Sequence, residues 1–219
     1  NAIIFLATFG TGISQGIDPN LLVPVAGGLF ILPFFLFSAT AGQLAEIHDK
    51  ARLIRLIKLA EVALMVLAAI ALVQRSVPML MVLLFMMGVQ STFFGPLKFS
   101  ILPDHLKEHE LIGGNAWVQA GTFVAILAGT IAGPQLAGIE VSWPYYVSAG
   151  CLAVAAAGYL FSLRVPQAAP VAPELKINWN IFTETVRNLK FLNESRVVLN
   201  SVLGISWFWF FGATFLVQI

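Results

Sequence analysis

A lysine stands inside one of the most apolar stretches of the chain, FFGPLKFSILPDHL, residues 93–106. An ammonium group within a membrane usually marks a substrate pathway, because it is tolerated there when it faces the interior of a helix bundle. The alternative is that the lysine stem lies in lipid and the amine reaches the membrane surface. Gly95 and Pro96 favour the first alternative, since a helix break frees backbone groups that normally line a cavity. We therefore predict that Lys98 faces a binding cavity.

Two other polar residues lie deep in apolar segments. Asn1 is about 15 residues from the end of its segment, and a buried amide needs hydrogen-bond partners. Those partners are either a substrate or a neighbouring helix. Glu61 could carry a proton, but an ion pair with Lys58 on the same helix face is the favoured interpretation.

A charged loop, EIHDKAR, follows the sequence GQLA. Its acidic side chains can pair with its basic ones and cap helix ends, which would hold one side of a bundle shut in one conformer. We predict a gating role rather than a binding role for this loop. The residues assigned to this gate are Gly42, Glu46, Asp49, Lys50 and Arg52.

Enzyme chemistry has little support in the sequence. His105 and His109 are four residues apart in DHLKEHE, but two histidines with nearby carboxylates make an incomplete metal site. The chain has one cysteine, Cys151, which excludes an internal disulfide. No serine–histidine–aspartate order and no phosphate-binding loop is present. We expect no enzyme activity, cofactor, metal or nucleic-acid partner for this chain.

The elements that must position these residues are membrane helices. Hydrophobic residues make up 58% of the chain and charged residues 11%, and the mean hydropathy is +0.87. Apolar runs of about 20 residues cross a membrane core about 30 Å thick. The first run is shorter and has no initiator methionine, so we expect the sequence to be a piece of a longer protein. The expected spans are residues 1–16, 21–45, 53–73, 78–102, 115–139, 143–163 and 196–219.

A polar segment separates the sixth and seventh spans. RVPQAAPVAPE, residues 164–174, favours extended polyproline geometry. The stretch that follows carries Trp179, Phe182, Val186 and Leu189 at helical spacing, which predicts an amphipathic helix. That helix could lie along the membrane surface or pack against the protein's own cytoplasmic face. Both alternatives remain open on the sequence.

Lysine and arginine in short loops predict orientation, because they accumulate on the cytoplasmic side. Arg75 is the only one in the loops after spans one, three and five. The loops after spans two, four and six are therefore expected to be cytoplasmic. With their flanks they contain Lys50, Arg52, Arg55, Lys58, Lys107, Arg164, Lys176, Arg187, Lys190 and Arg196.

A repeat indicates the fold. ATAGQLAE ends the second span and GTIAGPQLAG ends the fifth, so that Gly42 aligns with Gly133. Three spans separate the copies, and an odd number forces them into opposite orientations. We predict an all-α membrane protein: a major-facilitator N-terminal six-helix half (a 3+3 inverted repeat), a linker and part of a seventh helix. The expected domains are a bundle at 1–163 with helix 1 truncated, a cytoplasmic linker with its helix at 164–195, and the start of a C-terminal bundle at 196–219.

GPLKFSILPDHL, followed by GGNAWVQAGTFVAILAGTIAG, resembles the bacterial lysophospholipid transporter family of the major facilitator superfamily. That family has a proline, a lysine and an aromatic residue before Ile-Leu in span four. Here the matching positions are Pro96, Lys98 and the pair Ile101-Leu102. Asn1 resembles the end of the family's Asp-Asn pair in span one. The likeness is closest to the form fused to acyltransferase and acyl-ACP synthetase domains.

The resemblance implies an alternating-access flippase in the bacterial inner membrane. It would move lysophosphatidylethanolamine-type lipids to the cytoplasmic leaflet, where a fused or separate acyltransferase and synthetase re-acylate them. Lysophospholipid and membrane lipids are then the expected ligands, with Lys98 and Asn1 beside the headgroup. Stand-alone members carry an arginine in span seven, where this sequence has Leu216. The alternatives are another major-facilitator porter, of drugs or small metabolites, and a membrane platform for fused lipid-modifying enzymes.

Overall fold

The computed structural model describes residues 19–137, 143–175 and 177–218, and every regular element in those ranges is a helix. Asn1 and the first expected span lie outside the described residues. The helices, in chain order, are α2 (Pro19–Ile47), α3 (Lys50–Val73), α4 (Val77–Ser100), α5 (Leu102–His105), η1 (Glu108–Glu110), α6 (Leu111–Ala137), α7 (Trp143–Ser162), α8 (Ile181–Glu194) and α9 (Arg196–Gln218).

The described helices confirm the expected pattern of spans. α2 begins at Pro19, two residues before the expected span 21–45, because proline suits the first turn of a helix. The apolar part of α9 within the described residues is shorter, Arg196–Gly212. Within the described ranges, five stretches are long and apolar enough to cross a membrane: Pro24–Ile47, Lys50–Val73, Val77–His105, Glu108–Gly133 and Trp143–Ser162.

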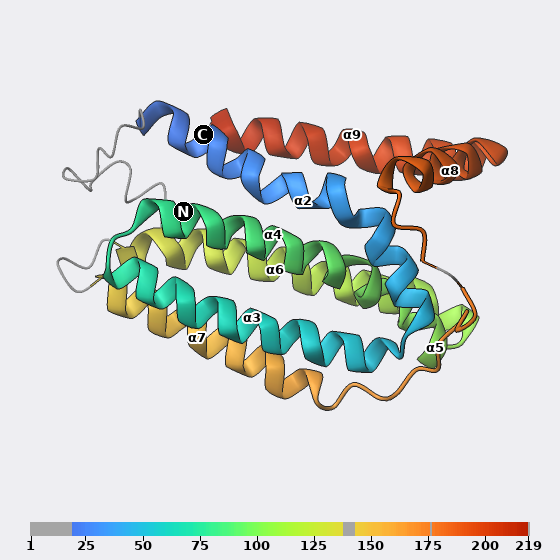
Figure 1. Ribbon diagram of the computed structural model, residues 1–219, viewed down its shortest axis with the longest axis horizontal. Helices are drawn as coiled ribbons and strands as arrows, with labels where there is room; N and C mark the ends of the chain where they lie inside the picture. The colour runs from blue at the N-terminus through green and yellow to red at the C-terminus, as the bar shows by residue number, and fades with distance from the viewer. Residues whose placement is uncertain (1–18, 138–142, 176, 219) are drawn as a thin grey trace. The chain divides into compact units, whose positions relative to one another are not determined.

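The chain divides into two compact units, Asn1–Ile177 and Asn178–Ile219. In the first unit α2 runs along α4, and α3 packs between α4 and α7 (Figure 1). One buried apolar cluster joins α3, α4 and α7 through Leu72, Leu83 and Trp143. A second lies at the predicted cytoplasmic end and includes Ile54, Leu97 and Ile101. These clusters hold α3 and α4 in register, which fixes the positions of the polar residues that they carry.

α2 and α4 approach most closely at Gly88. A Cβ atom added at Gly88 would overlap the carbonyl oxygen of Phe30 and lie 3.0 Å from Cγ of Pro33. Pro33 itself is buried in the interface. Small residues in membrane helices allow this kind of contact, where backbone meets backbone. Gly88 therefore sets the spacing of the two helices.

The polar linker begins as part of the first unit. Backbone N–H groups of Val171 and Ala172 both donate to the carbonyl oxygen of Glu46, each at 3.0 Å, and Nη2 of Arg55 donates to the carbonyl oxygen of Val165 at 2.9 Å. Ala168 is buried in the cluster at the predicted cytoplasmic end. These contacts explain why the division between the units falls inside the linker segment that we expected at 164–195.

The second unit contains α8 and α9. The side chain of Asn180 accepts a hydrogen bond from the backbone N–H of Thr183 and so caps α8 at its first turn. Glu184 is 2% exposed; it accepts a hydrogen bond from Asn178 and pairs with Arg187 at 2.9 Å. Ser195 alone separates α8 from α9. A helix, α8, thus occupies the segment in which we expected an amphipathic helix, and α9 follows directly.

Candidate functional site

Lys98 lies two residues before the end of α4 and is partly buried. Phe94 precedes it by one turn on the same helix face, and the Phe94 ring centroid is 4.5 Å from Nζ of Lys58 on α3. Lys98 is therefore on the side of α4 that faces α3 within the bundle. Its own Nζ is 4.9 Å from the ring centroid of Phe99.

Gly95 and Pro96 lie inside α4, which continues without interruption to Ser100. The break that we expected is thus limited to the loss of one N–H donor at Pro96, which leaves the carbonyl of Thr92 without its usual helical partner. A Cβ atom at Gly95 would contact nothing within 4 Å among the described residues. The described residues therefore leave this position, one turn before Lys98, uncovered.

A second group of polar side chains joins α3 to α4 further into the membrane span. Nζ of Lys58 is 2.7 Å from Oε2 of Glu61, and Nε2 of Gln90 donates to the same oxygen at 2.9 Å. The side chains of Lys58 and Glu61 are 20% and 18% exposed. Gly158 of α7 makes room for the lysine, since a Cβ atom there would lie 3.7 Å from Lys58 Nζ.

This arrangement confirms the expected Lys58–Glu61 pair. Its two charges offset each other, and Gln90 satisfies a further lone pair of the carboxylate, as a charge pair in a region of low dielectric requires. The sequence did not indicate Gln90 as a partner. The available signal for this contact was that Gln90 is a polar residue in an apolar span and that the preceding span carries the acidic Glu61.

Lys50, in the predicted gating loop, pairs with a different residue from the one expected. Nζ of Lys50 is 2.6 Å from Oδ2 of Asp104 and donates to the carbonyl oxygen of Ser100 at 2.9 Å, and the residue is 3% exposed. We expected Lys50 to pair with Glu46 or Asp49, and that expectation was wrong. Ser100 is the last residue of α4, where unpaired carbonyls and the helix dipole both favour a cation.

The other residues of the gating loop have mixed roles. The Asp49 side chain accepts from the backbone N–H of Arg52 at 2.8 Å and caps α3, as expected for an acidic cap. Glu46 contributes its backbone carbonyl to the linker, and its side chain is exposed. Arg52 is exposed, and a Cβ atom at Gly42 would contact nothing within 4 Å among the described residues. A gating function for these residues stays a prediction.

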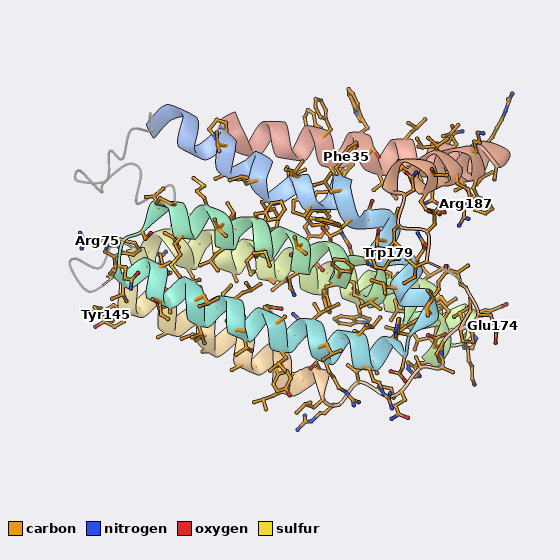
Figure 2. The ribbon with its side chains drawn as sticks, in the orientation of Figure 1. Phe35, Arg75, Tyr145, Glu174, Trp179 and Arg187 are labelled. Carbon is orange, nitrogen blue, oxygen red and sulfur yellow. The ribbon has the colours of Figure 1, made fainter. Side chains whose placement is uncertain are left out.

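The two ends of the first unit differ in character. Arg75 and Tyr145 lie at one end and Glu174 lies at the other (Figure 2). Tyr145 is 62% exposed, as is common for aromatic residues at a membrane–water boundary.

Among the described residues, no three histidine, cysteine, aspartate or glutamate side chains gather where they could hold a metal ion.

Comparison with known proteins adds a family assignment. The sequence profile of the Major Facilitator Superfamily matches residues 2–219. Lysophospholipid transporter LplT of Cronobacter sakazakii (strain ATCC BAA-894) is 27% identical over 219 residues, which cover 98% of this chain and 51% of that protein. The proteins of the same name from Serratia proteamaculans (strain 568) and Escherichia coli (strain SE11) are 27% identical over 221 residues, with the same coverage.

The chain spans about half the length of the curated relatives that it matches. No solved structure matches it. The similarity extends along almost the whole chain, so it includes the spans that carry Lys58, Glu61 and Lys98.

Proposed function

Because the chain belongs to the major facilitator superfamily, we propose that it forms half of a lysophospholipid transporter. The transporter moves lysophosphatidylethanolamine-type lipids to the cytoplasmic leaflet of the bacterial inner membrane by alternating access. The observation that carries this proposal is Lys98, a partly buried ammonium group on the side of α4 that faces α3, one turn from Gly95, whose added Cβ would meet no described residue within 4 Å. The printed names of the relatives, lysophospholipid transporters, support the same class of substrate.

The energetics of Lys98 favour an anionic ligand. A lysine at the centre of a membrane helix costs about 2.5–3.5 kcal/mol on insertion scales, and somewhat less near a helix end. The cation–π contact with Phe99 offsets about 0.5–2 kcal/mol of this insertion cost. A phosphate would supply the remainder through a charge-assisted hydrogen bond. Lys58 has no such need, because Glu61 already balances its charge.

The headgroup is then held by few contacts. Lys98 binds the phosphate, and Asn1 binds the amine or the glycerol hydroxyl. The single acyl tail stays in an apolar channel or in the bilayer between spans, where it loses no hydrophobic stabilisation. An acyltransferase and an acyl-ACP synthetase, fused or separate, re-acylate the lipid on the cytoplasmic side. The Lys50–Asp104 pair ties the cytoplasmic ends of α3 and α4, so that this half moves as a rigid body.

The test is lysolipid flipping by the full-length protein in proteoliposomes. Lys98→Ala removes a charge-assisted hydrogen bond of about 1.5–3 kcal/mol, so we expect the flipping rate at low substrate to fall about 10- to 100-fold. Lys98→Arg keeps the charge and should retain part of the rate. Lys107→Ala, an exposed lysine outside the spans, is the matched control and should leave the rate unchanged.

Three outcomes would contradict the proposal. Undiminished flipping by Lys98→Ala would remove Lys98 from the mechanism. Competition by a water-soluble drug or metabolite would instead indicate another kind of porter. Acylation of externally added lysolipid that continues when flipping is blocked would indicate a membrane platform for lipid-modifying enzymes.

A further inference from the structure

α8 presents an apolar strip that the rest of its own unit leaves exposed. Val186 is 51% exposed and Leu189 is 59% exposed, and their spacing of three residues places them on one helix face. Trp179, just before the helix, is 73% exposed. Thr185 and Leu192, four residues before and three residues after Leu189, extend this face and are partly buried. Exposure is therefore greatest at Val186 and Leu189.

Basic and hydroxyl side chains border this strip. A shallow hollow of about 490 Å³ is lined by Thr183, Val186, Arg187 and Lys190. Glu184 is almost fully buried and pairs with Arg187 at 2.9 Å, which fixes the guanidinium while leaving that side chain 65% exposed. Two cations and a hydroxyl beside an apolar residue suit a phosphate group attached to an acyl chain.

The connection to α9 places α8 next to a membrane. α8 ends at Glu194 and α9 begins at Arg196, and α9 is apolar from Arg196 to Gly212. We expect the seventh span to begin with α9, and with one residue between the two helices the end of α8 then stays near the membrane surface. An amphipathic helix with basic residues and exposed tryptophan at that level binds in the plane of the interface.

We propose that α8 is an interfacial helix whose Val186–Leu189 strip enters the adjacent leaflet and whose Thr183, Arg187 and Lys190 bind the phosphate of an anionic phospholipid. The loop charges make this the cytoplasmic leaflet. The binding partner is the bilayer itself rather than the transported lipid, so the inference goes beyond the proposed function.

Spin labelling of the full-length protein in vesicles tests the insertion. In a Cys151→Ala background, single cysteines replace Val186 or, on the opposite face, Asn188, and each carries a nitroxide. We expect the label at position 186 to be accessible to oxygen and shielded from a water-soluble nickel chelate, and the label at position 188 to show the reverse. A label at position 186 shielded from both reagents would mean packing against protein, and one open to nickel would mean solvent; either result overturns the proposal.

Lipid charge tests the phosphate site. Vesicles of phosphatidylcholine are compared with vesicles in which about a third of the lipid is phosphatidylglycerol. The anionic lipid should lower nickel access at position 186, and Arg187→Gln with Lys190→Gln should abolish that difference. Lys107→Gln, an exposed lysine outside α8, is the control and should preserve it. An effect of anionic lipid that survives the double replacement would show that these two cations do not bind the headgroup.

Discussion

At the residue scale, the two lysines within the spans differ in what surrounds them. Lys58 has a carboxylate at 2.7 Å, an aromatic ring at 4.5 Å and a glycine of α7 that leaves room for it. Lys98 has an aromatic neighbour, and no described carboxylate forms an ion pair with it. A charge that is already balanced stabilises helix packing, whereas an unbalanced one is available to a ligand.

This difference predicts how Glu61 behaves. Glu61→Gln leaves Lys58 without an anionic partner, which should lower the free energy of unfolding by about 2 kcal/mol, less than the 3–5 kcal/mol of a fully buried pair. Replacing both residues with methionine should restore stability to within about 1 kcal/mol, because no charge is then left unpaired. The measurement is equilibrium unfolding in mixed detergent micelles, together with the flipping rate.

A proton-carrying Glu61 would give a different result. In that case the double methionine variant would be stable but inactive, and the flipping rate of the wild type would depend on pH through this carboxylate. Stable, active double variants would leave Glu61 with a packing role only.

At the scale of elements, the interface between α2 and α4 is set by a single glycine. Gly88 brings the α4 backbone against the carbonyl of Phe30 and the ring of Pro33. The small residues that stand out in the sequence behave differently. A Cβ atom at Gly121 or Gly129 of α6 would meet nothing within 4 Å among the described residues, so neither glycine sets a helix spacing there.

The substitution Gly88→Ala should therefore lower the free energy of unfolding. The added methyl would overlap backbone that cannot rotate away, and overpacking of this kind costs about 1–3 kcal/mol. Gly28→Ala on α2 is the matched control, because its Cβ would contact nothing within 4 Å and alanine favours helix formation. Equilibrium unfolding in detergent should show a lower free energy of unfolding for Gly88→Ala and no decrease for Gly28→Ala. Equal stability of the two variants would contradict the close approach.

At the scale of the whole molecule, the distribution of charge determines how the chain inserts. The buried Lys50 pairs with the more exposed Asp104 at one end of the first unit, next to the linker that bonds to Glu46. Arg75 and Tyr145 lie at the opposite end (Figure 2). The end with more basic residues should remain in the cytoplasm, because lysine and arginine in short loops resist translocation.

Labelling with a membrane-impermeant maleimide checks this orientation in bacterial spheroplasts. In the Cys151→Ala background, a cysteine in place of Arg75 should react in intact spheroplasts. A cysteine in place of Glu108, which is exposed in η1, should react only after permeabilisation. The reverse pattern would invert the topology and place the Lys50–Asp104 pair outside the cell.

The helices could be read from the sequence because their apolar runs are long and their ends carry strong signals. Asp49 caps α3 and Asn180 caps α8 through their own side chains, so that local chemistry fixes both starts. The Lys58–Glu61 pair was equally accessible, since residues three apart on a helix must be neighbours. These features depend on contacts within one element.

Other features depend on contacts between helices, and only the tertiary structure decided them. Lys50 pairs with Asp104 rather than with acidic residues closer in sequence, because the C-terminal end of α4 lies beside it after the helices pack. Gln90 joins the intramembrane pair and Gly88 sets a helix spacing for the same reason. A sequence specifies which groups are polar or small, but the partner of each is determined by which helices the apolar clusters bring together.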